Sequence, residues 1–220
     1  MTKRVGRGKG EWMAQTRSQE TRERVLKAAE ELVIEFGHET MPMKELIARS
    51  GISNGSIFHH FGSKDGVLDE IFTRERRDYL GYVAQCILAH EGDPCDAMGE
   101  GARGAIEFQA RDPQRHFRLV VQFSHSEWLV RNKGGWSELA GEIERPVMEW
   151  AIPHLAAGKL PMLQPTTIQS LMLGAAELIC HQWRTGRITG PLEDQAPIAA
   201  RFVSAGLRRL RDEMAPPASQ

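Results

Sequence analysis

The chain has 220 residues, of which 41% are hydrophobic and 26% charged, with 21 glycine, 11 proline and three cysteine residues. This composition is typical of a globular protein with a core, and it excludes a disordered, a collagen-like or a disulfide-stapled chain. Taken as a whole, the formal net charge of −1 argues against a nucleic-acid-binding protein, because such domains usually carry a basic excess.

The average charge hides an uneven distribution along the chain. Residues 1–29 hold eight Lys and Arg against three Glu, a net charge of +5, and the other 191 residues sum to −6. Local fields, and not totals, attract phosphate groups. The basic N-terminal segment therefore keeps nucleic acid among the candidate partners.

The sequence shows no signal for export or for a membrane span. The N-terminal segment is charged and lacks the apolar stretch of a secretory signal peptide. The longest apolar-rich stretch, Leu171–Cys180, contains Glu177 and is too short to cross a bilayer. Cys86, Cys95 and Cys180 form no CxxC pair, which indicates free thiols in a reducing compartment. We expect a cytoplasmic protein without a membrane partner.

Apolar residues recur with the 3.6-residue period of a helix and no strand pattern stands out, so the sequence predicts an all-α fold. The first helix is expected to start near Thr16 or Ser18, where the spacing fits a capping box, and to end at Gly37. Residues 1–16 are then predicted to be a flexible basic arm.

Three further helices complete the predicted N-terminal domain, residues 17–77. The second runs from Pro42 to Arg49 and ends at Gly51, and the third runs from Ser53 to about His60. The fourth is long and covers residues 64 to about 90.

Helices are also predicted over residues 94–110, 113–124, 135–157, 165–187 and 193–213, within a C-terminal domain that covers residues 78–214. Pro146 and Pro153 fall inside the third of these helices. Each removes a backbone donor and clashes one turn back, so they are expected to kink or split it. Residues 215–220 are expected to be disordered.

The segment at about residues 42–61 has the pattern of a helix-turn-helix. Leu46, Ile47, Ile52 and Ile57 would form its apolar interior, and Gly51 supplies the positive φ of the turn. The second short helix then exposes small or hydrogen-bonding residues in place of a Glu/Lys face. Residues of this kind read base edges or hold phosphates; here they are Ser53, Asn54, Gly55, Ser56, His59 and His60.

The same region resembles the TetR family of bacterial transcription regulators. The matching residues are Thr21 to Leu26, Ala28-Ala29, Gly37, Lys44 to Leu46, Gly51 to Ser53, Gly55 to Phe61, Ser63 to Asp65 and Leu68. The resemblance implies an N-terminal three-helix DNA-binding domain and a C-terminal helical domain that binds a ligand and dimerises. It also implies repression that a small molecule relieves.

The resemblance further implies roles for single residues. Ser53, Asn54, Ser56 and His59 would face the DNA groove, where Gly55 allows close approach. Residues at or near phosphates would be Arg17, Arg22, Lys44, Phe58, His60 and Lys64, and Thr40 would replace the hydroxyl that Met41-Pro42 lacks. Lys3, Arg4, Arg7 and Lys9 of the arm would enter the minor groove. His59 and His60 point about 100° apart on a helix, so neither a metal site nor a cofactor is expected.

Residues 81–220 carry no catalytic signature, so no enzymatic activity is expected. Their aromatic and thioether side chains have two interpretations: a packed core, or the lining of an apolar effector pocket that includes residues of the fourth helix. The candidate lining is Tyr79, Tyr82, Cys86, Phe108, His116, Phe117, Phe123, His125, Trp128, Trp136, Met148 and Trp150.

The last two predicted helices carry apolar stripes that are either core or a homodimer interface. The candidate interface residues are Ile168, Leu171, Met172, Ala175, Ile179, Trp183, Ile198, Phe202 and Ala205. The sequence thus favours a homodimeric repressor that a small apolar or aromatic effector releases from palindromic double-stranded operator DNA. The alternative is a helical small-molecule-binding protein or enzyme with a vestigial helix-turn-helix.

Overall fold

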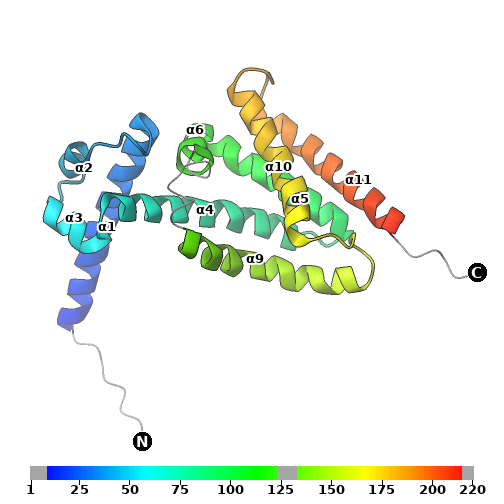
Figure 1. Ribbon diagram of the computed structural model, residues 1–220, viewed down its shortest axis with the longest axis horizontal. Coiled ribbons are helices and arrows are strands. Elements are labelled where there is room, and N and C mark those ends of the chain that lie inside the picture. Colours follow the sequence, from blue (N-terminus) through cyan, green and yellow to red (C-terminus); the bar gives the residue numbers. More distant parts are fainter. Residues whose placement is uncertain (1–8, 123–132, 215–220) are drawn as a thin grey trace, which may run out of the picture. The chain divides into compact units, whose positions relative to one another are not determined.

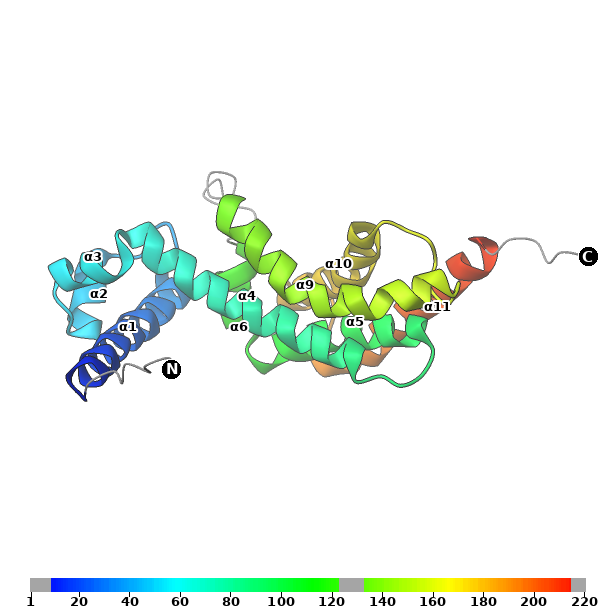
Figure 2. The same ribbon diagram turned by 90° about the horizontal axis from the view of Figure 1, so that it is seen from below.

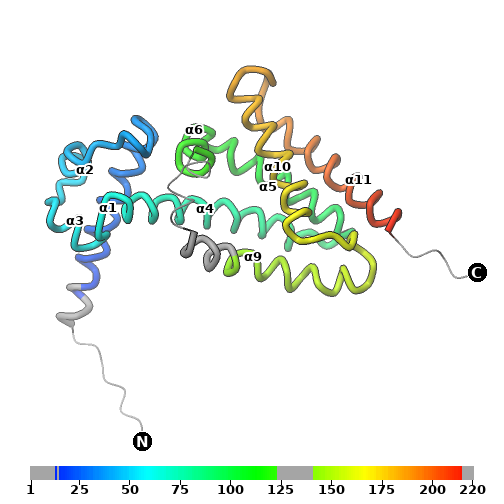
Figure 3. The backbone as a smooth tube through the Cα atoms, viewed as in Figure 1, coloured from blue at the N-terminus to red at the C-terminus, as the bar shows by residue number. Residues whose placement is uncertain are grey.

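The computed structural model describes residues 9–122 and 133–214, with backbone alone for residues 9–12, 14 and 133–140. Every regular element in these ranges is helical, which confirms the predicted all-α fold. Figure 3 follows the chain from the N-terminal helices in blue and cyan to the C-terminal helices in orange and red. The chain forms two compact units, and each is described by itself.

The N-terminal unit contains the helices α1 (Lys9–Phe36), α2 (Met43–Ser50) and α3 (Asn54–Phe61) (Figure 1). It also contains α4 (Lys64–Leu88) as far as Glu75, and the π-helical turn η1 (Phe117–Val121), which packs on α1. Its core is formed by Val25, Leu26, Ala29, Leu32, Val33, Met41, Leu46, Ile57, Val67, Leu68, Ile71 and Phe72.

Helix α1 begins at Lys9, earlier than the sequence indicates. The predicted start at Thr16 or Ser18 is wrong, and residues 9–16 are helical where a flexible arm was predicted. Residues 11–16 contain no glycine or proline, so nothing interrupts the helix before Thr16. Residues 1–8 of the predicted arm, with Lys3, Arg4 and Arg7, lie outside the described residues.

The C-terminal unit contains the rest of α4 with α5 (Pro94–Arg111), α6 (Pro113–His116) and α9 (Lys133–Ala156). It continues with α10 (Pro165–Arg184), the 3₁₀ turn η2 (Leu192–Gln195) and α11 (Ala196–Met214). Helix α9 runs beside the later part of α4 (Figures 1 and 2), and α5 packs against both α10 and α11. Helix α5 is therefore the centre of this unit.

Small residues let α5 lie close to its neighbours. A Cβ atom on Gly99 would lie 2.1 Å from Ser204 Oγ and 2.6 Å from the carbonyl oxygen of Ala200 on α11. On Gly101 it would lie 2.6 Å from the sulfur of Met172 on α10. These distances are shorter than van der Waals contact, so a side chain at Gly99 would force the backbone of α11 to move, and one at Gly101 would displace neighbouring side chains.

Ion pairs tie the first turn of α5 to the last turns of α11. Asp93 caps α5 by accepting the backbone N–H of Cys95 at 2.8 Å, and Arg211 lies 2.9 Å from the same carboxylate. The backbone hydrogen bond and Arg211 hold the pKa of Asp93 below its usual value, although burial opposes them. Arg208 pairs with Asp96 at 2.7 Å.

Helix α9 is continuous through Pro146 and Pro153, so the expected split is wrong. Both prolines are exposed, as are Glu142 and Glu149, the residues four positions earlier. The carbonyls that lose their donors thus belong to solvent-exposed residues, where water can hydrate them.

The predicted helix over residues 113–124 is divided in the structure into α6, which ends at His116, and η1, which ends at Val121. Residues 123–124 are not described. None of the described helices has the length and apolar character that a membrane crossing needs.

Candidate nucleic-acid interface and ligand pocket

The turn between α2 and α3 is built around Gly51, as the sequence predicts. Gly51 closes α2 with φ 64° and ψ 22°, a left-handed conformation that favours glycine, and its N–H donates to the carbonyl of Ile47 at 3.0 Å. Arg24 of α1 donates to the carbonyl of Ser50 at 2.6 Å. The Ser50 hydroxyl bonds back to the carbonyl of Leu46 at 2.6 Å. The turn is therefore fixed by its own backbone and by α1.

Helix α3 is anchored by one side and exposed on the other. Ser53 caps it by accepting the backbone N–H of Ser56 at 3.3 Å, and Ile57 is fully buried against the core. Asn54 and His59 are exposed, as are Ser53, Gly55 and Phe58. Ser56 and His60 are half-buried. The polar residues predicted to read DNA thus share one short helix and mostly face solvent.

Arg22 holds the C-terminal end of α3. Its guanidinium donates to the carbonyl of His60 at 2.7 Å, pairs with Glu70 of α4 and lies 4.6 Å from the centroid of the Phe61 ring. A cation is favourable at a helix C-terminus because the last carbonyls lack helical partners. These contacts show Arg22 positioning α3 inside the unit, and its contact with a phosphate, which the resemblance implies, stays a prediction.

Other predicted phosphate contacts lie around the same surface with different partners. Lys64 donates through Nζ to the carbonyl of Glu39 at 3.1 Å, and the Thr40 hydroxyl donates to the carbonyl of Phe36. Arg17 and Lys44 are exposed. Their exposed cationic groups remain the simplest candidates for contact with a phosphate backbone.

Three features of this unit are absent from the sequence-based prediction. Arg24 clamps the turn, and Gly66 allows α4 to approach α3: a Cβ atom there would lie 2.0 Å from the carbonyl oxygen of Phe61. Arg74 pairs with Glu23 through two hydrogen bonds of 2.5 and 3.0 Å. Charged residues on α1 with partners 26 to 51 residues away give no local sequence signal.

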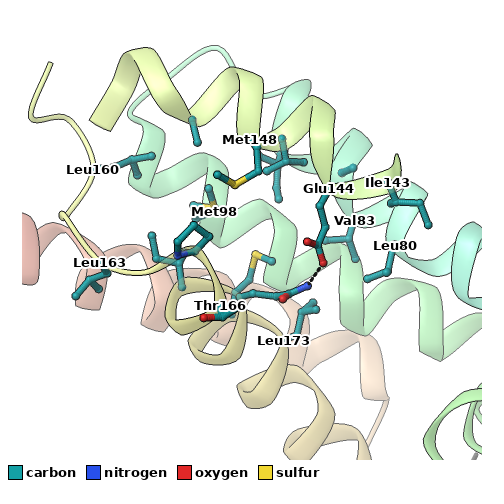
Figure 4. A pocket seen from close by; sticks show the side chains of 18 of the residues that line it. Leu80, Val83, Met98, Ile143, Glu144, Met148, Leu160, Leu163, Thr166 and Leu173 are labelled. Atoms are coloured by element: carbon teal, nitrogen blue, oxygen red, sulfur yellow. Dashed lines mark hydrogen bonds between the residues drawn. The ribbon is translucent and has the colours of Figure 1, made fainter. Parts of the chain in front are cut away.

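The C-terminal unit contains a pocket of about 850 Å³, counting its open mouth, between α4, α5, α9, α10 and the segment before α10 (Figure 4). Its wall is mostly aliphatic and thioether. The lining residues are Leu80, Val83, Ala84, Ile87, Met98, Ile143, Glu144, Val147, Met148, Ala151, Leu155, Leu160, Leu163, Pro165, Thr166, Ile168, Gln169, Met172 and Leu173. A concave, mostly apolar wall with a few polar groups is typical of small-molecule sites.

Among the predicted pocket residues whose side chains the structure describes, Met148 alone lines this pocket, and the predicted aromatic side chains among them do not. Tyr79, Phe108 and His116 pack on one another with ring centroids 4.5 to 5.8 Å apart, and Arg111 lies over the Tyr82 ring at 4.1 Å. Burial of Tyr79 raises the pKa of its hydroxyl.

The remaining predicted pocket residues lie elsewhere or outside the described side chains. Cys86 contacts the α5 face at Gly104, Trp150 packs on His154 at 4.8 Å, and Phe117 belongs to the N-terminal unit. Phe123, His125 and Trp128 lie outside the described residues, and the side chain of Trp136 is not described.

The predicted dimer stripe divides into an inner and an outer part. Ile168 and Met172 are buried and line the pocket, so their assignment to an interface with another chain is corrected. Leu171, Ile198 and Phe202 are 46%, 49% and 70% exposed. The other predicted residues are exposed or half-buried: Ala175, Ile179, Trp183 and Ala205. Helical periodicity groups all of these residues without separating the two faces.

The described side chains include no group of three or more His, Cys, Asp or Glu residues that could hold a metal ion. The rings of His59 and His60 lie 5.3 Å apart in a T-shaped arrangement.

Comparison with known proteins points to one family. Residues 25–71, from α1 into α4, match the family described as bacterial regulatory proteins, tetR family. The HTH-type transcriptional regulator UidR of Escherichia coli is 37% identical over 66 residues, which cover 30% of this chain and 34% of UidR. The HTH-type transcriptional repressor BepR of Brucella suis is 27% identical over 110 residues, which cover 50% of this chain and 53% of BepR. The matches thus span between a third and about half of these relatives.

Solved structures extend the likeness to nearly the whole fold. A TetR family transcription regulator from Marinobacter aquaeolei superposes with a TM-score of 0.72 at 12% identity, covering 88% of this chain and 98% of that chain. The fatty acid degradation regulator FadR from Bacillus halodurans gives a TM-score of 0.65 at 14% identity, covering 86% of this chain and 96% of that chain. At such identities the likeness shows the fold alone. The helix-turn-helix segment of this chain, residues 25–71, is thus similar in sequence to the tetR family of bacterial regulatory proteins, and the rest of the chain shares the fold of its solved members.

Proposed function

We propose that the protein is a transcription regulator that binds double-stranded DNA through α3. The observation that carries this proposal is the exposed polar face of α3 on a helix that is capped by Ser53, anchored by Ile57 and clamped by Arg22. Amide, hydroxyl and imidazole groups on a fixed helix suit hydrogen bonding to base edges in the major groove. Similarity to BepR and to AcnR of Corynebacterium efficiens, both HTH-type transcriptional repressors, favours repression over activation.

The protein is proposed to bind as a homodimer on a palindromic operator. One short helix offers few base contacts, and a two-fold dimer doubles them by reading two half-sites. The exposed apolar residues of α10 and α11 support this, because Leu171, Leu178, Ile198 and Phe202 would otherwise leave an apolar surface in water.

A small, largely apolar effector is proposed to occupy the pocket of the C-terminal unit. Helix α4 contributes Leu80, Val83 and Ile87 to its wall, and the same helix begins in the N-terminal unit with Lys64. An effector that binds one arrangement of α4 more tightly than another would shift the population toward it and change the affinity for DNA.

The test is a binding titration of the full chain with the DNA upstream of its own gene, measured by fluorescence anisotropy at several salt concentrations. We expect binding to a discrete fragment, with an affinity that falls linearly with salt on a logarithmic scale because counterions are released. A scrambled fragment of equal length is the control. Failure to bind any upstream fragment at low salt would leave the helical small-molecule-binding protein as the better assignment.

A further inference from the structure

The pocket of the C-terminal unit contains one polar spot in an otherwise apolar wall. Glu144 of α9 accepts a hydrogen bond from the side-chain amide of Gln169 on α10, with 3.0 Å between Gln169 Nε2 and Glu144 Oε1 (Figure 4). Thr166, one turn before Gln169, also lines the pocket. The other lining side chains that the structure describes are aliphatic or thioether.

Among the described lining residues, Glu144 is the one with an ionisable side chain. The Gln169 amide satisfies one of its two carboxylate oxygens. Arg76 of α4 interacts electrostatically with Glu144 and Glu177, but it does not line the pocket. Among these described lining residues, a ligand therefore meets a carboxylate and a side-chain amide, and no cation.

We infer that the pocket selects an aliphatic amphiphile with a cationic, hydrogen-bond-donating head, such as a primary alkylammonium, seated against Glu144 and Gln169. An ammonium group has three donors and no acceptor, so it matches the second carboxylate oxygen of Glu144 and the amide oxygen of Gln169. A carboxylate head would place like charges side by side, and none of the described lining residues is a cation that could offset them, which opposes binding.

The rest of the wall fits the body of such a molecule. Met98, Met148 and Met172 lie in the wall with Leu, Ile and Val side chains. Unbranched thioether side chains adapt to irregular shapes. The wall therefore holds the apolar part of the ligand by van der Waals contact and does not require one particular ligand shape. Selectivity thus comes from the charge of the head.

The experiment is isothermal titration calorimetry of the full chain with three eight-carbon probes: octylammonium, 1-octanol and octanoate. At neutral pH these present a cationic, a neutral and an anionic head on the same chain. We expect octylammonium to bind at least about tenfold more tightly than octanoate, with octanol between them. Glu144→Gln should remove most of this preference.

Glu149→Gln is the matched control, because Glu149 lies on the same helix but is exposed and does not line the pocket. It should keep the preference of the unchanged protein, and thermal unfolding of both variants checks that they fold. Equal or tighter binding of octanoate, an unchanged preference in Glu144→Gln, or no binding of any probe would overturn the assignment.

The cation-selective site stands independently of the proposed function, but its effect on DNA binding rests on that function. Adding octylammonium to the protein–DNA complex distinguishes the site from the effector response. Selective binding in calorimetry without any change in DNA affinity supports the site and contradicts the proposed effector response. Selective binding with DNA release supports both.

Discussion

The two units are stabilised by different kinds of residue. In the N-terminal unit, arginines of α1 reach neighbouring elements: Arg22 holds the end of α3 and Arg24 holds the turn before it. In the C-terminal unit, small residues of α5 let helices approach within contact distance, while α4, α9 and α10 enclose an apolar pocket. The first arrangement fixes a surface, and the second leaves an adaptable interior.

This contrast teaches where specificity resides in each unit. Hydrogen-bond readout of base edges requires side chains at fixed positions, and charged clamps provide them at the ends of a helix of only eight residues. A pocket lined by methionine and aliphatic residues accepts variable shapes, so its directional contacts come from its few polar residues, with Glu144 and Gln169 at their centre. Substitutions in the two units should therefore have different effects on stability and binding.

The largest effect is expected at the packed face of α5. Gly99→Val should lower the free energy of unfolding by about 3 kcal/mol, because the side chain would overlap Ser204 and the backbone of Ala200. Thermal unfolding by circular dichroism measures it. Gly141→Ala on α9, where a Cβ atom meets nothing within 4 Å, should instead stabilise by up to about 1 kcal/mol. Equal stability of the two variants would contradict the close packing of α5.

A smaller loss is expected at the clamp of the N-terminal unit. Arg22→Ala should cost about 2 kcal/mol, because it removes hydrogen bonds to the His60 carbonyl and to Glu70. The same change should weaken DNA binding by displacing α3. Chemical unfolding and DNA titration measure the two effects.

Arg17→Ala is the control for that variant, because Arg17 is exposed on the same helix. If Arg17 contacts a phosphate, its loss should reduce the salt slope of DNA binding by about one and leave stability unchanged. Arg22→Ala with unchanged stability would show that the clamp does not hold α3.

The helix-turn-helix could be predicted from sequence because its signals are local. Gly51 and Ser53 each act within one turn of their own position, and both cap helices in the structure. The start of α1 could not be predicted, because a capping-box spacing at Thr16 also fits the interior of a longer helix.

The pocket could not be predicted because its location depends on the rotation of whole helices. Tyr79 and Leu80 are neighbours on α4, yet Leu80 lines the pocket while Tyr79 packs on Phe108 and His116. Periodicity identifies an apolar stripe but not the element that it packs against. For that reason the sequence places the buried Ile168 and the 70% exposed Phe202 in the same candidate interface.

The smallest effect concerns the acid dependence of the N-terminal unit. The hydrogen bonds from Arg74 lower the pKa of Glu23. A carboxyl whose pKa is lowered on folding contributes stability above its unfolded pKa, about 4.3, and loses it as the pH falls through the folded value. Both side chains are partly exposed, so the contribution is a few tenths of a kcal/mol.

Glu23→Gln should flatten the stability profile by this small amount below about pH 4.3 and also lower stability slightly at pH 7. Urea unfolding at a series of pH values measures it. A profile identical to that of the unchanged protein would show that the pair is fully screened by solvent.

The claim that the exposed face of α3 reads DNA is tested most directly by the double variant Ser56→Ala with His59→Ala. Its affinity should be compared with that of the unchanged protein for the selected upstream fragment and for a scrambled fragment, with Gln114→Ala, an exposed residue outside α3, as the control. We expect the double variant to lose at least about tenfold in affinity for the selected fragment, with binding to scrambled DNA and thermal stability unchanged. An undiminished preference for the selected fragment would contradict the account.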